Sequence, residues 1–395
     1  MMRKISETIF LLKTSNGRVF MPFLWLLFIL MISSCNGSAD ISYENGIEVV
    51  HNKAEPNKIN RKRINISLEE INAIDLDSSQ LIEKGFGSAG EFDVDSNGNI
   101  YIVGFKNREY YINKIDKTGN LLLSFGRRGE GPGEINTPIR PTIYDDHLLV
   151  ITDMFKKLIY YDLQSGGCVR EILFKTPMSI VECLPDNKFL VYKSKSSSYS
   201  KERYFRSLNI YDDQWKMIKE LDVDECPPQE EMGLLPPYFM WRVSNKGIYI
   251  VNEKRGYEIQ KFDHDGKLLR KIKKEYHPVR LSEELEKEIA GPNYQVDYSY
   301  QGKKMRYLAP MNSIFCDDEE RFFVMTYEKS DTSAGFIHNV FNADGLYIGD
   351  ITINKDWAGI INSPKYTVIK NNKLYYYREK ADGFRELVVC HIKYE

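Results

Sequence analysis

A short apolar pattern recurs along the chain at intervals of about 50 residues. Residues 99–103 are followed by residues 112–123 in one unit, and residues 247–251 are followed by residues 259–269 in another. Each unit reads as strand, turn, strand, Asp-Gly-type turn and strand, because apolar and polar residues alternate between Gly, Asn and Asp. Units of this length with three or four short strands are typical of β-propeller blades.

Two recurring sequence patterns, used here as markers, indicate the number of units. An aromatic or aliphatic residue followed by Asp or Asn occurs at Ile115-Asp116, Tyr161-Asp162, Tyr211-Asp212, Phe262-Asp263 and Phe341-Asn342. A second apolar element, which we predict to be the inner strand, occurs at residues 99–103, 147–150, 188–191, 247–251, 321–324 and 373–376. The second marker predicts six blades. Cys183 and Cys316 lie six residues before the first apolar residue of this element, where Val94 and Val368 lie in other units, so we expect them to be small core residues.

The last unit is incomplete. Residues 366–369, 374–377 and 387–394 supply three strands, and the chain then stops. Residues 64–82 carry strand-like runs before the first full unit. An N-terminal strand that completes the last blade would remove the exposed edge strands. The predicted fold is therefore all-β, a six-bladed β-propeller over residues 64–395 closed by an N-terminal strand.

Two excursions interrupt the pattern. The longer one lies between Glu275 and Pro310 and begins with a predicted helix at residues 282–289, with Ser282 as its N-cap. It continues with a Tyr-rich stretch, and the second excursion, residues 226–241, is rich in Pro and aromatic residues. Insertions in repeat folds often form the binding face. The aromatic candidates for binding are Tyr238, Trp241, Tyr294 and Tyr298.

The N-terminus has the form of a lipoprotein signal. Basic residues precede an apolar run from Phe20 to Ile32, and Ser33 and Ser34 then precede Cys35. The run has thirteen residues, whereas a membrane-spanning helix needs about 20. We predict a signal peptide at residues 1–35, lipidation of Cys35 and a tether at residues 36–63. The protein would be exported and anchored by lipid to the bacterial envelope, with the outer-membrane, periplasmic and surface faces all open.

Charge and cysteine content exclude several classes of site. The chain has a net charge of −2 and no basic stripe, so no nucleic-acid partner is expected. Apart from Cys35 there are five cysteines, with no Cys/His spacing suited to zinc. No cofactor is predicted. Asp93, Asp95 and Asn97 match the start of a calcium loop, but Gly104 stands where a bidentate Glu is needed, so we favour a tight turn.

A glycine-rich stretch at residues 125–134 is the most specific local motif. It lacks the Gly-Lys-Ser/Thr of a P-loop, and no helix follows it. Arg127 and Arg128 are candidates for binding an anion or a sugar. The alternative is a structural crossover at the central channel, with these arginines paired to Glu130 or Glu134.

This motif, the lipoprotein signal and six degenerate blades together resemble the six-bladed β-propeller lipoprotein family of bacterial cell envelopes, which is distantly similar to NHL-repeat propellers. The resemblance covers roughly residues 64–395. It implies fold and compartment, and it carries over no catalytic residue.

Two functions follow from these features. The first is a binding module that presents its insertion-bearing face to an envelope protein or a glycan. The alternative is an envelope enzyme, a hydrolase or lyase that acts on a saccharide, lactone or peptide in the central channel, which would need converging carboxylates or histidines. The chain has no HExxH motif and no G-x-S-x-G motif. The sequence favours binding and leaves catalysis open.

Overall fold

The computed structural model describes residues 39–58, 64–76, 79–83, 89–154, 156–175, 180–194, 204–226, 239–285, 299–300, 303–304, 307–330, 335–353, 366–380 and 385–395. Within these ranges, no helix has the length and apolar character needed to cross a membrane.

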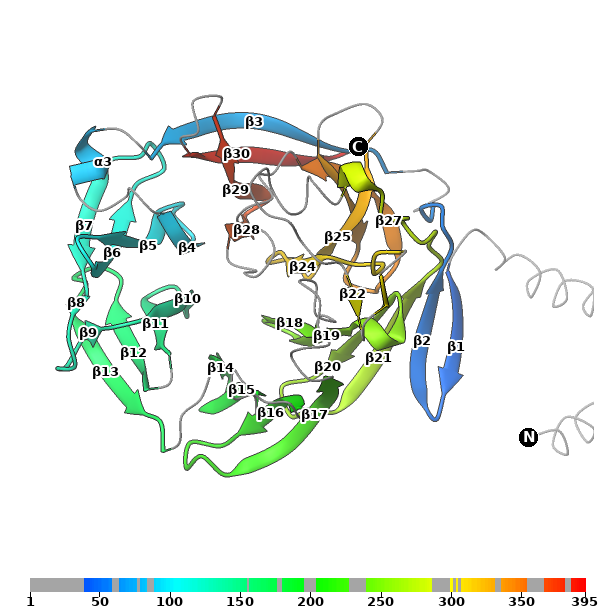
Figure 1. The fold of residues 1–395 in the computed structure, drawn as a ribbon, viewed down its shortest axis with the longest axis horizontal. Coiled ribbons are helices and arrows are strands. Elements are labelled where there is room, and N and C mark those ends of the chain that lie inside the picture. The colour runs from blue at the N-terminus through cyan, green and yellow to red at the C-terminus, as the bar shows by residue number, and fades with distance from the viewer. Residues whose placement is uncertain are drawn as a thin grey trace, which may run out of the picture. The chain divides into compact units, whose positions relative to one another are not determined.

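Six antiparallel sheets stand around a central channel (Figure 1). Blade 1 comprises β4 (Ala89–Val94), β5 (Ile100–Lys106), β6 (Glu109–Ile115) and β7 (Leu121–Phe125). Blade 2 comprises β10 (Pro138–Tyr144), β11 (Leu148–Asp153), β12 (Lys157–Asp162) and β13 (Cys168–Leu173). Blade 3 comprises β14 (Ile180–Leu184), β15 (Lys188–Ser194), β16 (Tyr204–Tyr211) and β17 (Met217–Cys226).

The second half of the ring is built in the same way. Blade 4 contains β18 (Phe239–Ser244), β19 (Gly247–Asn252), β20 (Glu258–Phe262) and β21 (Leu268–Lys274). Blade 5 contains β24 (Ser313–Cys316), β25 (Phe322–Lys329), β26 (Phe336–Phe341) and β27 (Tyr347–Ile353). Blade 6 contains β28 (Thr367–Lys370), β29 (Lys373–Glu379), β30 (Arg385–Tyr394) and β3 (Ile66–Asp75). The predicted all-β fold with six blades is confirmed.

Strand β3 closes the ring as predicted. It pairs antiparallel with β30 from Ile66 opposite Tyr394 to Asp75 opposite Glu386. Beyond this ladder, Asn65 and Glu395 exchange two main-chain hydrogen bonds of 2.7 and 2.9 Å. The N-terminal strand thus becomes the outermost strand of the last blade, so β30 has no free edge.

The element predicted to be the inner strand is the second strand of each blade, so that assignment was wrong. The innermost strands are the upstream segments β4, β10, β14, β18, β24 and β28 (Figure 1). The second strand carries the stronger apolar signal because it is covered on both faces and paired on both edges. All six residues of β19 are buried, for example. The innermost strand has one edge toward the channel and therefore carries more polar residues.

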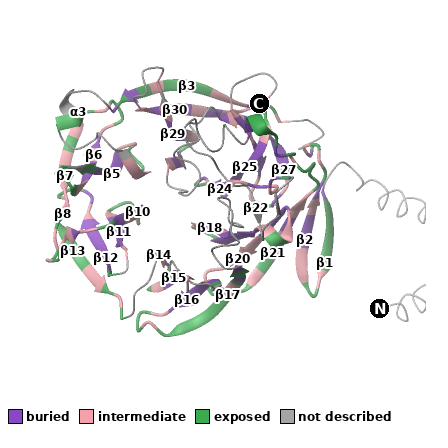
Figure 2. Cartoon of the chain, in the orientation of Figure 1, coloured by how far each residue is buried: buried purple, intermediate pink, exposed green. Residues whose placement is uncertain are grey.

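Hydrophobic clusters join every pair of neighbouring blades. Between blades 6 and 1, for example, Tyr375 and Leu387 pack with Phe92 and Ile100. Exposed residues concentrate on the outer strands, such as β1 and β17 (Figure 2). The core is therefore divided into six layers between sheets, one at each junction of the ring.

The recurrent Asp or Asn has a local cause. At the turn between the third and fourth strands of blade 1, Asp116 Oδ1 accepts the main-chain N–H groups of Thr118 at 2.8 Å and Asn120 at 2.9 Å. Asp212, Asp263 and Asn342 accept equivalent pairs in blades 3, 4 and 5. A short acceptor side chain satisfies turn N–H groups that the strand ladder leaves unpaired.

Residues 36–63 do not form only a tether. Strands β1 (Asp40–Glu44) and β2 (Ile47–Asn52) form a hairpin on the outside of blade 4, where β2 runs parallel to β21. Asn45 and Gly46 both have positive φ, 51° and 81°, as a two-residue hairpin turn requires. The repeat pattern could not indicate this addition, because no other blade has a counterpart among the residues that the structure describes.

Smaller elements complete the described chain. They are the helix α3 (Ser79–Glu83), the 3-10 turn η3 (Glu253–Arg255) and the strand pairs β8 (Arg127–Arg128) with β9 (Glu134–Ile135) and β22 (Ser299–Tyr300) with β23 (Lys303–Lys304). In the long excursion, Ser282 Oγ accepts the N–H of Leu285 at 3.2 Å, as expected of an N-cap. The rest of the predicted helix lies outside the described residues.

Candidate functional site

A pocket of about 210 Å³ lies at one mouth of the central channel. Its walls are the ends of the innermost strands of blades 1, 2, 4, 5 and 6. The recurrent apolar position supplies Val94, Ile143, Val243, Cys316 and Val368 to these walls. The polar lining includes Arg242, Lys370 and Asp318. The innermost strands therefore converge on one small, mixed-polarity pocket.

The two cysteines at the recurrent position are neutral thiols. Burial raises the pKa of Cys316 far above its usual value, and burial raises the pKa of Cys183 to about 11. Cys183 also lies 3.0 Å from the hydroxyl oxygen of Tyr160. A thiol with a raised pKa is a poor nucleophile, so these contacts agree with the predicted packing role.

The carboxylates of the pocket accept hydrogen bonds from the protein itself. Asp93 accepts the main-chain N–H of Val94 and that of Ile143 in the next blade, both at 2.8 Å. Asp317 accepts Arg321 Nε at 2.6 Å, and Asp318 accepts the N–H of Asn371 at 3.1 Å. These three groups fix strand ends and turns around the channel.

Arg242, on β18, is the exceptional charge of this pocket. Its Nη1 donates to the main-chain oxygen of Trp241 at 2.6 Å, and it forms no ion pair with any described residue. Desolvation, followed by repulsion from Arg140, lowers the pKa of Arg242 to about 9. The guanidinium is still a cation at neutral pH, and Arg242 is partly buried, so the channel holds a partly desolvated positive charge.

The two carboxylates whose charges act on Arg242, those of Glu182 and Glu91, are engaged by other groups. Glu182 Oε1, on β14, accepts Arg140 Nη1 at 2.9 Å and Trp241 Nε1 at 3.0 Å. The Arg140 guanidinium also lies 5.1 Å from the centre of the Trp241 ring, within cation–π range. Arg140 has a positive φ of 54° at a bulge of β10, and its main-chain N–H donates to Glu91. One channel arginine is thus paired and the other is not.

Trp241 lies in the core and not on an exposed aromatic face as predicted. It is 4% exposed and stacks on Tyr192 with ring centres 5.0 Å apart. The second excursion, predicted for residues 226–241, ends earlier than predicted, because β18 already begins at Phe239. Tyr238, Tyr294 and Tyr298 lie outside the described residues.

The glycine-rich motif lies at the outer rim between blades 1 and 2, not at the central channel (Figure 1). Arg127 Nε donates to Glu134 at 2.9 Å, which is one of the predicted pairings, and Arg128 Nη1 donates to the oxygen of Arg108 at 3.1 Å. The Arg127 side chain is 81% exposed and borders an open hollow of about 420 Å³. The glycine-rich segment starts from the outermost strand β7 of blade 1, so it runs along the circumference of the ring to blade 2.

The calcium-like stretch is a turn. Asp95 Oδ1 accepts the main-chain N–H groups of Asn97 at 3.0 Å and Asn99 at 2.8 Å, and its Oδ2 accepts Asn99 Nδ2 at 2.8 Å. Among the residues placed by the structure, no group of three or more His, Cys, Asp or Glu side chains is arranged to hold a metal ion.

Sequence analysis did not predict Arg140, Glu182 or Arg242 as site residues. Glu182 and Arg242 each directly precede the recurrent apolar position, in blades 3 and 4. A charged residue at that place in an innermost strand indicates a side chain near the channel. The prediction did not use this signal, because it took the second strand of each blade for the innermost one.

The family comparison agrees with the fold. A family model described as a 6-bladed beta-propeller matches residues 91–224, which span blades 1 to 3. A crystal structure of a candidate exported protein from Bacteroides fragilis NCTC 9343 is 12% identical, with a TM-score of 0.49, and the match covers 87% of this chain and 99% of that one.

A second crystal structure, the Cps50 (Swd1) beta-propeller domain of Myceliophteria thermophila, is 11% identical with a TM-score of 0.40, over 82% of this chain and 99% of that one. No curated protein was found that matches the sequence. The chain is a six-bladed β-propeller, and over its first three blades it is similar to a family of that description.

Proposed function

We propose that the protein is a lipid-anchored binding module of the bacterial cell envelope, and that its channel pocket holds the acidic end of a ligand through Arg242. The observation that carries the proposal is the Arg242 guanidinium in the pocket, which forms no ion pair with a described residue, beside an Arg140–Glu182 pair that already engages the Glu182 carboxylate.

The free-energy cost of the Arg242 charge favours the binding of an anion from outside the protein. A desolvated charge without a partner costs free energy, and an ion pair with a ligand recovers part of that cost. The planar guanidinium suits carboxylate and phosphate groups, because it can donate two parallel hydrogen bonds. Lys370 lines the same pocket and has no ion pair with a described residue, so it supplies a second cation.

The size and lining of the pocket narrow the ligand class. Its volume of about 210 Å³ is below the roughly 300–1,000 Å³ of pockets that take drug-sized ligands. Ser244, Asn245 and Thr367 add hydrogen-bonding groups to the lining. A small hydroxylated carboxylate fits this set, either free or as the terminal residue of an acidic glycan.

Features of the sequence support the proposed compartment. The basic start, the short apolar run and the small residues before Cys35 support export and lipidation. The enzyme alternative has less support, since Asp93, Asp317, Asp318 and Glu182 already accept hydrogen bonds from the protein.

Titration calorimetry of residues 36–395 with glucuronate, and with glucose as the neutral control, tests the pocket. We expect saturable binding of glucuronate only. Arg242→Gln is expected to weaken it by at least about tenfold, or about 1.4 kcal/mol, because the charge that holds the carboxylate is gone.

The matched control is Arg170→Gln, the same substitution at an exposed arginine of the outermost strand β13. It should bind glucuronate like the unaltered protein. Equal affinity of Arg242→Gln and the unaltered protein, or no binding by either, would contradict the proposal.

A further inference from the structure

We infer that the outer face of strand β1, with Ile41 and Tyr43, docks on the bilayer surface that holds the lipid of Cys35. This inference rests on the proposed lipid anchor and adds a defined contact surface and orientation to it.

Few residues separate Cys35 from the folded domain. The structured domain begins at Ala39, which is 6% exposed. Only four Cα–Cα steps separate it from Cys35, which can span at most about 14 Å when fully extended. The tether first predicted for residues 36–63 would have allowed the propeller to move far from the membrane. Because the hairpin begins at Asp40, only five residues after Cys35, an anchored propeller must keep β1 near the headgroups.

Buried hydrogen bonds hold the β1–β2 hairpin in a fixed position on the propeller. Asn52, at the end of β2, is buried and donates from Nδ2 to the main-chain oxygen of Gly345 at 2.9 Å, while its Oδ1 accepts the N–H of Tyr347 at 2.8 Å. Asn57, also buried, donates from Nδ2 to Asn52 Oδ1 at 2.9 Å. These bonds fix the base of the hairpin to blade 5, while β2 pairs with blade 4. Contact of β1 with a membrane would therefore orient the whole ring.

Strand β1 exposes two side chains that suit a membrane surface. Ile41 is 57% exposed and Tyr43 is 70% exposed, and they lie two residues apart on one face of a strand that is paired on one edge only. Tyr is enriched at membrane–water interfaces, where its ring lies among apolar groups and its hydroxyl stays in water.

Two acidic groups of the hairpin are neutralised. Glu44 pairs with Lys271 and Lys273, both at 2.8 Å, and Glu48 pairs with Arg270 at 2.5 Å. Of the acidic residues on β1 and β2, only Asp40 forms no ion pair with a described residue, so little net charge opposes the approach of headgroups.

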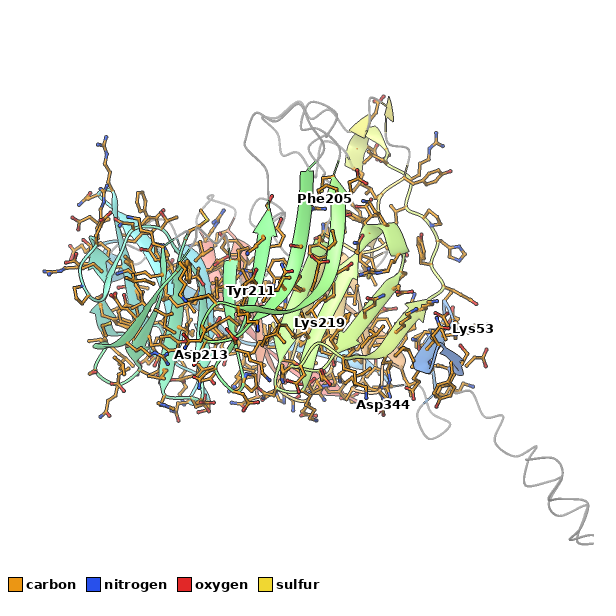
Figure 3. All side chains as sticks on the ribbon, turned by 90° about the horizontal axis from the view of Figure 1, so that it is seen from below. Lys53, Phe205, Tyr211, Asp213, Lys219 and Asp344 are labelled. Carbon is orange, nitrogen blue, oxygen red and sulfur yellow. The ribbon has the colours of Figure 1, made fainter. Side chains whose placement is uncertain are left out.

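Docking through β1 leaves the ligand site accessible. The hairpin lies on the outer circumference of the ring (Figure 1), and in the side view Lys53, which follows β2, lies at the lateral edge of the molecule (Figure 3). The pocket is lined by the innermost strands, which lie at the centre of the ring and not at this edge. The ring would stand on blade 4, with its pocket open to solvent.

Site-specific fluorescence tests the contact. The full-length lipidated protein is prepared with Cys168→Ala, which removes an exposed free thiol, and with Tyr43→Cys or Ile41→Cys labelled by an environment-sensitive fluorophore. It is reconstituted into phosphatidylethanolamine–phosphatidylglycerol vesicles that contain headgroup-proximal doxyl lipid. The control label is at Leu173→Cys on β13, which is 69% exposed and on the other side of the ring.

At least twofold quenching at positions 41 and 43, with none at 173, is the expected result. Vesicle-bound, acylated protein with no quenching at 41 and 43 would overturn docking and leave the anchor intact. Protein that is not acylated and stays off the vesicles would overturn the anchor and docking together. Two label positions guard against a misfolded single variant.

Discussion

A chain that begins at residue 77, and therefore lacks β3, is expected not to fold into a stable monomer. Its β30 would expose a ten-residue edge, and free edges recruit other chains. The deletion also removes Ile74 and Ile66, which are buried in the clusters on the two sides of blade 6. Each fully buried isoleucine contributes about 1.5–3 kcal/mol. Together with the lost strand ladder, this loss is comparable to the 5–15 kcal/mol that typically stabilises a protein.

The matched control carries residues 64–76 at the other end of the chain. Because Asn65 and Glu395 are hydrogen-bonded neighbours, a short turn can join Glu395 to residue 64 and return β3 to the same place. The permuted chain is expected to be monomeric by size-exclusion chromatography and to melt cooperatively by circular dichroism. A monomeric, cooperatively folded chain of residues 77–395 without β3 would refute the role of closure.

Cys35→Ala is expected to move the whole population from the membrane to the soluble fraction. The lipid is attached at this thiol in our account, and the thirteen-residue apolar run before it is shorter than the roughly 20 residues a spanning helix needs. Stable anchoring of a folded domain by lipid needs two or more chains, and this substitution removes all of them. Membrane fractionation with metabolic fatty-acid labelling measures the effect.

Cys168→Ala is the control, since Cys168 is another exposed free thiol. It should leave both membrane attachment and acyl labelling unchanged. Unchanged membrane partitioning of Cys35→Ala would contradict the lipid anchor and, with it, the docking of β1.

Blade number and ring closure could be predicted because each blade repeats the same local chemistry. The Asp or Asn at the outer turns accepts N–H groups within four residues, so it leaves a mark in the sequence. The hairpin β1–β2 could not be predicted in this way, because its position depends on parallel pairing with β21 and on Asn52 and Asn57 reaching blade 5. These contacts join residues more than 200 positions apart.

The channel site was missed for a similar reason. Arg140, Glu182 and Arg242 come from three blades, and only the closed ring brings their charges together. The candidates chosen from the sequence were aromatic residues and arginines that stood out locally. Of these, Trp241 does lie at the channel charges, but as a buried donor to Glu182 and not as an exposed ligand-binding surface.

Arg242 is a partly desolvated cation that forms no ion pair with any described residue. Urea unfolding of Arg242→Met and Arg140→Met tests this assignment. Replacing an unpaired desolvated charge with an apolar side chain should raise the free energy of unfolding by about 1–2 kcal/mol, whereas Arg140→Met should lower it by about 3 kcal/mol because Glu182 loses its partner. If Arg242→Met destabilises the protein as much as Arg140→Met does, Arg242 already has a partner, and the pocket does not need an anion.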